Sequence, residues 1–464
     1  MSTSPATQQR YVVLGGAGFL GSAIVRALVA RGEKNVLIVD VRPPAADAAT
    51  SSAAAFHQGD MTDEAALVAL FGKLKPDVVI HTASPIASGG QKELFERVNV
   101  RGTVNVVKAC QQNGITSLVF TSSAGVLFDG SNLINVDERM PYPLKAFDAY
   151  NDTKARAEQI VLAANTPRSD KAGLKTVSLR PAGIFGPGDR QALPGFFGVL
   201  AAGRTNVQLG DNTNLFDWTY VDNVAHAHLL AADKLHAEPY AMDELVHEHI
   251  AARILSPEER KLERAVPTSE KRPSPPGVPD FAADLPKQEL ERKLEPGEMA
   301  GTDIRPVARS KWDQFFYLVH PTVQNADNPA PQTWDFAADE EGAGAALEVA
   351  GQAFHITNGQ PMCFWDFPRA LWAAAGHPVN LKKVWSIPTG LGLWLAGASE
   401  TFAWLTRREA QFTQFKVTFS CATRYYNVEK ARRLLGYEPL VGMEEAVKRS
   451  AQWWQEEGHK LAPK

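Results

Sequence analysis

The sequence predicts an α/β protein built on a doubly wound parallel sheet. Short, continuously apolar runs alternate with amphipathic helical patterns through the first half of the chain, and a glycine-rich turn follows the first run. Continuous apolar strands are typical of a parallel sheet that helices cover on both faces. Right-handed crossovers between such strands then produce the doubly wound arrangement.

The expected elements follow one another in regular order. Strands are expected at 11–16, 35–40, 56–60, 77–83, 117–123 and 176–182. Helices are expected from the glycine turn to residue 30, at 63–73, at 92–112 and from about residue 149. Ordered structure resumes with a strand-like run at 353–359.

The composition is ordinary for a globular protein and excludes some partners. The 464 residues carry a formal net charge of −4, so no basic excess favours nucleic acid. The cysteines and the histidines near the motifs lack metal-binding or redox spacing, so we expect no metal site, a reducing compartment and structural roles. These residues are Cys110, Cys363, Cys421, His81, His226 and His228.

A glycine motif between the first strand and the first helix predicts a dinucleotide site. It reads GGAGFLG and places glycines at Gly15, Gly18 and Gly21, with Phe19 and Leu20 between the last two. The first glycine permits a tight turn, the second lets the backbone approach a pyrophosphate, and the third lets helix and strand pack closely. The phosphates would lie at the positive end of the helix, as in a Rossmann fold.

Two acidic residues that end strands refine the cofactor prediction. Asp40 follows the glycines by about twenty residues, where a carboxylate binds ribose hydroxyls and repels a 2′-phosphate, which favours NAD. Arg42 could instead meet a 2′-phosphate, so NADP stays open. Asp60, with Met61 beside it, could accept from the adenine amine or cap the helix beginning at Asp63.

Ser123, Tyr150 and Lys154 form the predicted catalytic constellation. Tyr150 and Lys154 are four residues apart on an expected helix and therefore share a face. An ammonium near a phenol lowers the phenol pKa toward working pH, where general acid/base catalysis requires it. Ser123 ends the fifth strand, at the edge where open parallel sheets bind ligands. Lys154 could also bind the hydroxyls of the nicotinamide ribose. Tyr150 and Lys154 are therefore both predicted to lie in contact with the cofactor.

Residues 387–398 and the following TFAWL form an apolar segment. About a dozen apolar residues are too few to span ~30 Å of hydrocarbon. The segment is either a buried helix or one that lies in a membrane interface, with Trp394, Phe402 and Trp404 as anchors and Arg407 and Arg408 beyond them.

The chain is expected to divide into two regions. Residues 1–190 would form the dinucleotide-binding domain, to which 214–232 and 352–360 return, and residues 191–464 would form a smaller substrate-binding region. Within it, 236–345 is rich in proline and charge and cannot bury enough apolar surface to offset its ordering entropy. We expect a partly disordered surface insertion there, with a partner-binding loop as the alternative.

With these motifs the chain resembles the extended short-chain dehydrogenases and, among them, the 3β-hydroxysteroid dehydrogenase family. The matching segments are GGAGFLG (15–21), ASP (83–85), VNVRGTVNVV (98–107), TSSAGVLF (121–128), DAYNDTKARAE (148–158), LRPAGIFGPGDRQ (179–191), NLFDWTYVDNVAHAH (214–228), FHITNG (354–359) and NVEKARRLLGYEP (427–439). The segments at 179–191 and 214–228 resemble the fungal subgroup that acts on sterol 4α-carboxylates. The insertion departs from the shorter members of the family.

The resemblance implies a reaction and further site residues. The implied reaction oxidises the 3β-hydroxyl of a 4α-carboxysterol to a ketone with loss of carbon dioxide, as in C4 demethylation in ergosterol synthesis. Asn99 would order the ends of the active-site strands, and Arg190 is our candidate for binding the carboxylate. The resemblance also assigns cofactor contacts to Ala83, Ser84, Pro181, Gly183 and Ile184.

A sterol needs an apolar pocket, and the second half is rich in aromatic residues. Phe196, Phe197, Phe364, Trp365, Phe367 and Trp385 could line such a cavity or belong to an ordinary core. The resemblance implies the cytosolic face of the endoplasmic reticulum membrane, with peripheral membrane contact through 387–408. It leaves a homodimer and contacts with other C4-demethylation enzymes open.

Two alternatives remain at this stage. The same fold could serve another 3β-hydroxysteroid dehydrogenase, or a reductase or epimerase acting on a different alcohol or ketone. A non-catalytic dinucleotide-binding protein is the other alternative, although such a protein usually loses the tyrosine and lysine that this chain keeps.

Overall fold

The computed structural model describes residues 5–44, 54–87, 92–138, 140–241, 346–407, 410 and 412–461. Most of the expected insertion at 236–345 therefore lies outside the described residues, as does Arg408. The described ends of this stretch meet, because β12 (Tyr240–Ala241) pairs antiparallel with β13 (Ala346–Leu347). The chain thus leaves and re-enters the described structure at a single point.

A seven-stranded parallel sheet forms the centre of the molecule, which confirms the predicted fold class. The strand order is β14-β7-β5-β4-β1-β2-β3. The bounds are β1 (Arg10–Leu14), β2 (Asn35–Asp40), β3 (Ala55–Gln58), β4 (Val78–His81), β5 (Ser117–Thr121), β7 (Lys175–Pro181) and β14 (Gln352–Ile356). β14 joins the edge of the sheet after more than 150 intervening residues, so the late segment at 352–356 pairs with β7.

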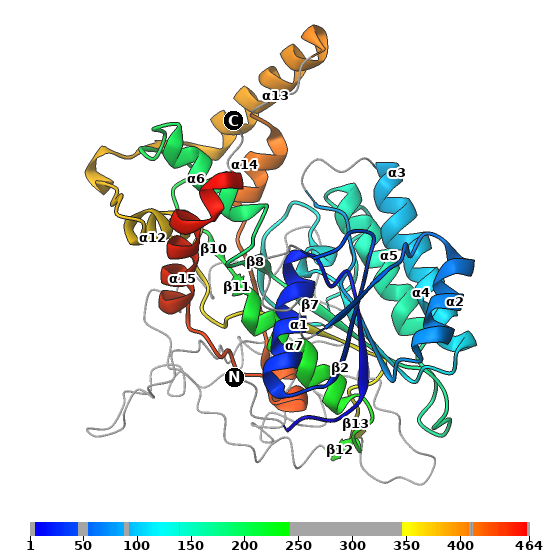
Figure 1. Cartoon of the computed structure of the whole chain (residues 1–464). Helices are drawn as coiled ribbons and strands as arrows, with labels where there is room; N and C mark the ends of the chain where they lie inside the picture. Colours follow the sequence, from blue (N-terminus) through cyan, green and yellow to red (C-terminus); the bar gives the residue numbers. More distant parts are fainter. Residues whose placement is uncertain are drawn as a thin grey trace, which may run out of the picture.

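Helices cover both faces of this sheet (Figure 1). α1 (Phe19–Arg31) and α7 (Val221–Lys234) pack together on one face, while α2 (Glu64–Leu74), α4 (Thr103–Gln112) and α5 (Ala149–Ala163) cover the other. The expected helix at 92–112 begins as α3 (Lys92–Phe95) and passes through a π-helical stretch, η1 (Glu96–Gly102), before α4.

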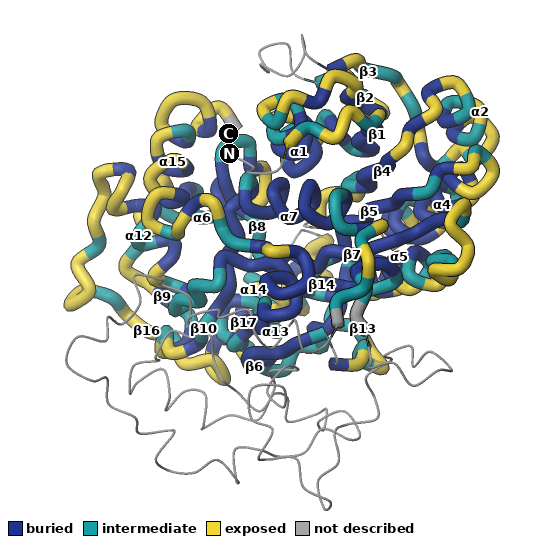
Figure 2. Tube along the Cα trace, turned by 90° about the horizontal axis from the view of Figure 1, so that it is seen from below, coloured by how far each residue is buried: buried dark blue, intermediate teal, exposed yellow. Residues whose placement is uncertain are grey.

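Side chains of a single strand serve both cores, as a doubly wound sheet requires. In β1, Tyr11 and Val13 pack toward α1 and α7, whereas Val12 and Leu14 pack toward α2 and α4. All four are almost fully buried. Figure 2 shows the central strands and α7 as buried, with exposed residues on the outer helices.

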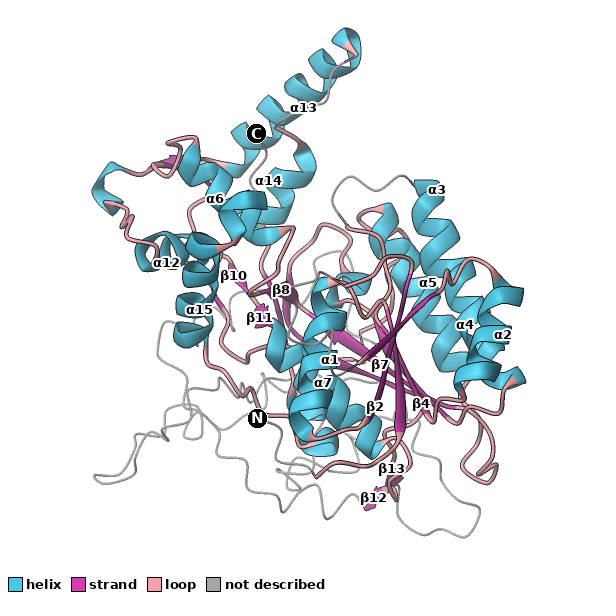
Figure 3. Ribbon diagram, in the orientation of Figure 1, coloured by secondary structure: helices cyan, strands magenta, loops and turns pink. Residues whose placement is uncertain are grey.

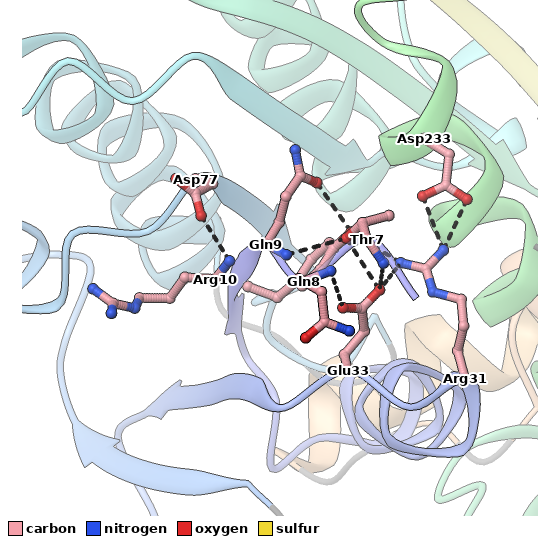
Figure 4. Close-up of polar contacts among 9 residues, drawn as sticks. Thr7, Gln8, Gln9, Arg10, Arg31, Glu33, Asp77 and Asp233 are labelled. Carbon is pink, nitrogen blue, oxygen red and sulfur yellow. Dashed lines mark hydrogen bonds and ion pairs between the residues drawn. The ribbon is translucent and has the colours of Figure 1, made fainter. Parts of the chain in front are cut away.

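The far end of the sheet is fastened by a buried polar network (Figure 4). The backbone amides of Thr7 and Gln8 donate to the carboxylate of Glu33 at 2.8 and 3.1 Å. Arg31 pairs with Glu33 and, from α1, with Asp233 at the end of α7. Because this network lies at the start of β1, it holds both helices at the edge opposite the carboxyl ends of the strands.

A second lobe contains small sheets and an aromatic core. Its elements are β8 (Gly183–Phe185), α6 (Ala192–Ala201), β9 (Val207–Leu209), β10 (Leu215–Phe216), β11 (Trp218–Tyr220), β15 (Met362–Cys363), α12 (Asp366–Ala374), β16 (Trp385–Ile387), α13 (Thr389–Thr406), α14 (Gln414–Cys421), β17 (Arg424–Tyr426) and α15 (Met443–Glu456). A four-stranded sheet, β15-β10-β17-β6, uses β6 (Leu133–Val136) from the first region. Of the aromatic candidates, Phe197, Phe364 and Phe367 are core, Phe196 and Trp365 pack against that core, and Trp385 is exposed.

The apolar segment at 387–406 forms a helix that leaves most of its large side chains exposed. α13 extends away from the rest of the lobe (Figures 1 and 3). It buries only Gly392, Ala396 and Ala403, while Trp394 and Trp404 are 69% and 78% exposed. Of the two alternatives for this segment, the buried core helix is therefore wrong. Within the described residues, no helix has the length and apolar content needed to cross a membrane.

Candidate active site

The glycine turn leaves an open helix end at the carboxyl edge of the sheet. Gly15 has φ +85°, and a Cβ on Gly21 would lie only 2.1 Å from the Gly15 carbonyl oxygen. α1 begins after Gly18, so no side chain caps the N-terminus of the helix. The first-turn amides and the positive end of the helix dipole thus fit a pyrophosphate.

Asp40 closes this turn from the end of β2. One of its carboxylate oxygens, Oδ2, accepts from the amide of Ala17 at 3.1 Å, and the other accepts from the amide of Arg42 at 3.4 Å. The carboxylate is thus held beside the glycine loop, where a ribose is expected. Asp60 is exposed and accepts from Thr62.

Of the two alternatives for Asp60, the helix cap is wrong. Asp63 caps α2, because its side chain accepts from the amide of Ala66 at 3.0 Å. Asp60 lies too early in the chain to reach these amides and closes a tight turn instead.

The remaining predicted cofactor contacts surround the turn or the neighbouring strand ends. Ala83 packs so closely on the turn that a Cβ on Gly15 would lie 2.7 Å from its backbone. Phe19 lies against Gly188, while Leu20 and Met61 are buried in the two cores.

The loop after β7 places three predicted residues at the boundary between the lobes. Pro181 ends β7, and Gly183 and Ile184 lie in β8, which pairs with β11. A Cβ on Gly183 would lie 3.0 Å from the Trp218 ring, so packing on an aromatic ring alone accounts for this glycine.

Tyr150 lies in the first turn of α5 at the edge of the active-site strands. Asp148 fixes the start of this helix by accepting from the Asn151 amide at 2.7 Å. The pKa of Tyr150 is raised to about 12, mainly by burial and also by the negative charge of Asp148, while a hydrogen bond with Ser84 opposes both. The ring packs edge-on against Phe95, with centroids 5.7 Å apart.

Lys154 lies one turn further along α5 and is almost fully buried. Its ammonium donates to the Thr121 carbonyl at 2.5 Å and lies 4.3 Å from the centre of the Phe120 ring. Burial lowers its pKa to about 7, against the opposing charge of Glu158. The expectation that Lys154 lowers the pKa of Tyr150 is wrong for this arrangement, because the ammonium faces β5 and burial dominates the phenol.

Ser123 follows β5 and caps a short 3₁₀ turn, η2 (Ala124–Leu127). Its hydroxyl oxygen accepts from the Gly125 amide at 3.0 Å, which leaves the hydroxyl proton available to a ligand. In the described chain no direct hydrogen bond joins Ser123, Tyr150 and Lys154 to one another. They share the carboxyl edge of the adjacent strands β4 and β5, with Tyr150 bonded to the loop after β4 and Lys154 to the end of β5.

Asn99, expected to order the ends of the active-site strands, joins the loop after β4 to α5 through its contacts. The Ser84 hydroxyl donates to the Asn99 side-chain oxygen at 3.0 Å, and the Asn99 amide donates to Thr153 at 3.1 Å. Asn99 is 1% exposed, so it acts as a buried link between the loop after β4 and α5. Ser84, which hydrogen-bonds with the phenol of Tyr150, is itself positioned by its hydrogen bond to Asn99.

A buried ion pair supports α5 from β7. Glu158 of α5 accepts from Arg180 Nη2 at 2.6 Å and from Ser178 at 2.8 Å. These residues are 20–22 positions apart in sequence, so periodicity could not reveal the pair. Arg190, the expected carboxylate-binding residue, is exposed.

Two of the three histidines near the motifs, His81 and His228, form hydrogen bonds within the protein. His81 contacts Thr103 at 3.1 Å, and burial lowers its pKa to about 3. His228 contacts Thr121 at 2.7 Å. No group of three histidine, cysteine or acidic side chains among the described residues could hold a metal ion.

Comparison of the sequence with known families decides the assignment. The sequence profile of the 3-beta hydroxysteroid dehydrogenase/isomerase family matches residues 12–249. The chain belongs to this family. It is 35% identical over 95% of its length to a sterol-4-alpha-carboxylate 3-dehydrogenase, decarboxylating, of Schizosaccharomyces pombe, and covers 96% of that protein. The Saccharomyces cerevisiae protein of the same name is 33% identical, with 96% of this chain and 97% of that one covered.

Solved structures support the fold at lower similarity. A UDP-glucose 4-epimerase of Thermus thermophilus, solved with NAD, has a TM-score of 0.55 and 18% identity, with 97% of this chain and 99% of that chain covered. The structure titled gox2253 has a TM-score of 0.58 and 17% identity, with 98% and 100% covered. At this identity the likeness concerns the fold.

Proposed function

We propose that this chain is an NAD-dependent sterol-4α-carboxylate 3-dehydrogenase that oxidises the 3β-hydroxyl of a 4α-carboxysterol with loss of carbon dioxide. The observation that carries the proposal is the similarity to decarboxylating dehydrogenases over nearly the whole chain, combined with Tyr150, Lys154 and Ser123 at one edge of the sheet. Residues 1–190 would supply the dinucleotide-binding domain, and residues from 191 onward the substrate region.

Tyr150 is the proposed acid/base. A bound nicotinamide dinucleotide would supply the hydride acceptor for C3 of the sterol. Tyr150 would take the proton of the 3β-hydroxyl while the Ser123 hydroxyl donates to the same oxygen. Because burial holds the pKa of Tyr150 near 12 when Lys154 faces Thr121, the phenolate needs the Lys154 ammonium turned toward it.

The product ketone stands β to the carboxylate, which sets the second step. The bond between C4 and the carboxyl carbon breaks, and carbon dioxide leaves. The electron pair of that bond stays with C4 and is delocalised onto the C3 oxygen as an enolate. Ser123 and Tyr150 can donate hydrogen bonds to that oxygen and stabilise the developing charge. Protonation of the enolate at C4 completes the reaction.

Asp40 supports NAD over NADP. Its carboxylate is fixed beside the glycine turn by the amides of Ala17 and Arg42, so it can bind ribose hydroxyls and would repel a 2′-phosphate. Replacing Asp40 with Ala should weaken NAD more than NADP. An unchanged preference, measured as the ratio of the two kcat/KM values, would remove Asp40 from the ribose site.

α13 supports contact with a lipid surface, where a sterol substrate is dissolved. Its exposed aromatic and leucine side chains include Leu391, Trp394, Phe402, Trp404 and Leu405. Exposed Trp385, together with Lys382 and Lys383, precedes it. Aromatic anchors beside lysines suit the interface of an anionic membrane, and the proposed location is the cytosolic face of the endoplasmic reticulum.

The proposed function is tested with the purified full-length chain, a 4α-carboxy-3β-hydroxysterol and NAD. We expect reduced cofactor to form with the wild type, and the same sterol lacking the 3β-hydroxyl to give none. Absence of reduced cofactor with the carboxysterol, together with turnover of another alcohol such as a sugar nucleotide, would favour a different member of the fold.

A further inference from the structure

Arg424, at the start of β17, is a buried cation in an aromatic cage. It is only 7% exposed. Its guanidinium carbon lies 4.1, 4.3 and 4.6 Å from the ring centres of Phe419, Phe128 and Phe216. These three rings come from α14, from the loop after η2 and from β10, so the cage closes only in the folded chain.

Within the cage, the guanidinium nitrogens of Arg424 do not all have hydrogen-bond acceptors. Nη2 donates to the Phe419 carbonyl at 3.0 Å, while Nε is buried and has no partner among the described residues. Burial lowers the pKa of this guanidinium to about 10, so it remains charged at neutral pH. A buried charge is costly unless it is paired, and cation–π contacts offset only part of this cost.

The carboxylate that interacts with Arg424 already caps a helix. Asp148 interacts electrostatically with Arg424, but no ion pair joins them within the described chain. Its carboxylate accepts from the amides of Tyr150 and Asn151 as the cap of α5. Within the described chain the guanidinium therefore has no acidic ion-pair partner.

Arg424 is connected through packed rings to the turn that Ser123 caps and to the helix that carries Tyr150. Phe128, one wall of the cage, directly follows the turn that Ser123 caps. The same Phe128 packs on Phe147 with centroids 4.7 Å apart, and Phe147 directly precedes the cap of the helix that carries Tyr150. β17 is also tied to this region, because the Tyr426 hydroxyl donates to the Ala124 carbonyl at 3.3 Å.

The geometry points to Arg424 as the residue that binds the 4α-carboxylate of the substrate, an inference that rests on the proposed function. The rings around it suit the apolar sterol, and its free donor suits a carboxylate. Phe419 and Phe415 of α14 stack with centroids 5.9 Å apart, and α14 packs beside α13. An aromatic wall thus runs from the exposed helix to the caged cation. Arg190, in contrast, is solvent-exposed.

The test replaces Arg424 with Met, which keeps an apolar stem in the cage, and with Lys, which keeps the charge. The substrate carboxylate is ionised both in the ground state and during hydride transfer. Removing the Arg424 guanidinium should therefore weaken both states alike and raise mainly KM. For the 4α-carboxysterol we expect Arg424→Met to raise KM by about 10- to 100-fold with kcat within about threefold, and Arg424→Lys to recover part of the loss. For the 4α-methyl analogue, kcat/KM should stay unchanged.

Arg204→Met, at an exposed arginine of the same lobe, serves as the matched control, with thermal melting and NAD binding as checks on folding. Equal losses on the carboxylated and methylated sterols, or an unchanged KM, would overturn the assignment. Equilibrium binding of both sterols, followed by tryptophan fluorescence, separates this inference from the proposed function. A wild-type preference for the carboxylated sterol that Arg424→Met abolishes supports Arg424 even without turnover, whereas turnover without that preference refutes it.

Discussion

The central sheet and helix α13 of the C-terminal lobe differ in the burial of their large apolar side chains. In the sheet, Val12, Val13 and Ile80 are fully buried between helices on both faces. In the lobe, α13 holds equally apolar residues, yet Trp394 and Trp404 lie in solvent at its outer surface. The first pattern stabilises the fold, whereas exposed apolar surface of the second kind is typical of an interaction site.

This difference in burial suits the different roles proposed for the two regions. The sheet positions the groups proposed to bind the dinucleotide and to transfer the proton, and the Glu33 network stabilises its far end. The lobe supplies aromatic rings, a caged cation and an exposed apolar helix. In the proposed function, the chemistry therefore belongs to the first region, and recognition of an amphipathic, membrane-dissolved substrate belongs to the second.

The largest expected effect follows from removing the acid/base in the first region. Tyr150→Phe should lower kcat by roughly 10²–10⁴ while leaving the dissociation constant for NAD within about threefold. The hydroxyl is lost but the ring can keep its packing against Phe95. Near-normal turnover in a stopped-flow assay would take Tyr150 out of the mechanism.

A smaller but still large effect is expected at the glycine turn. In Gly21→Ala the new Cβ would meet the Gly15 carbonyl at 2.1 Å, so the turn must move, at a cost of about 1–3 kcal/mol in stability. Gly195→Ala in α6 is the matched control, because a Cβ there meets nothing within 4 Å. We expect weaker NAD binding and a lower melting temperature only for Gly21→Ala; equal behaviour of the two variants would contradict the close approach.

Asp217 tests the buried polar groups of the lobe through pH. Burial raises its pKa to about 7, against hydrogen bonds from the Tyr426 amide and Thr357, and Oδ1 lacks a partner among the described residues. Since the folded state binds this proton more tightly than the unfolded state, the stability it contributes is lost as pH rises from about 4 through 7.

Asp217→Asn should therefore stabilise the protein at pH 8 by about 1–3 kcal/mol, and by less at pH 5. Denaturant melts at the two pH values measure the difference. A gain that is larger at pH 5 than at pH 8 would show that the carboxyl is ionised and well paired in the fold.

The smallest effect on stability is expected on α13. Trp394→Ser with Trp404→Ser should change the free energy of unfolding by no more than about 0.5 kcal/mol, because both rings are exposed. The same double variant should lose most of its sedimentation with anionic liposomes. Trp372→Ser, at a ring that is 1% exposed, should cost about 3–5 kcal/mol. A large loss of stability on α13 would mean that this helix packs against protein.

The sequence predicted the parts of the molecule that depend on local pattern. Apolar runs located the strands to within a few residues, and the spacing of Gly15, Gly18 and Gly21 located the turn. The spacing of Tyr150 and Lys154 placed both on α5, but it could not show that the lysine faces Thr121, because that depends on burial.

Features made by distant segments escaped prediction. Phe128, Phe216, Phe419 and Arg424 are spread over nearly 300 positions, and only the folded chain brings them together. Likewise, the apolar pattern of α13 is the same for a buried helix and an exposed one. The tertiary surroundings, not the pattern, decide which of the two forms.

The most direct test of the central claim counts carbon dioxide against reduced cofactor. With a sterol labelled in its 4α-carboxyl group, the wild-type chain should release one labelled carbon dioxide for each NADH formed, and Tyr150→Phe should lose both products together. Reduced cofactor without labelled carbon dioxide would mean that the chain oxidises the sterol without removing its 4α-carboxylate, and would contradict the account.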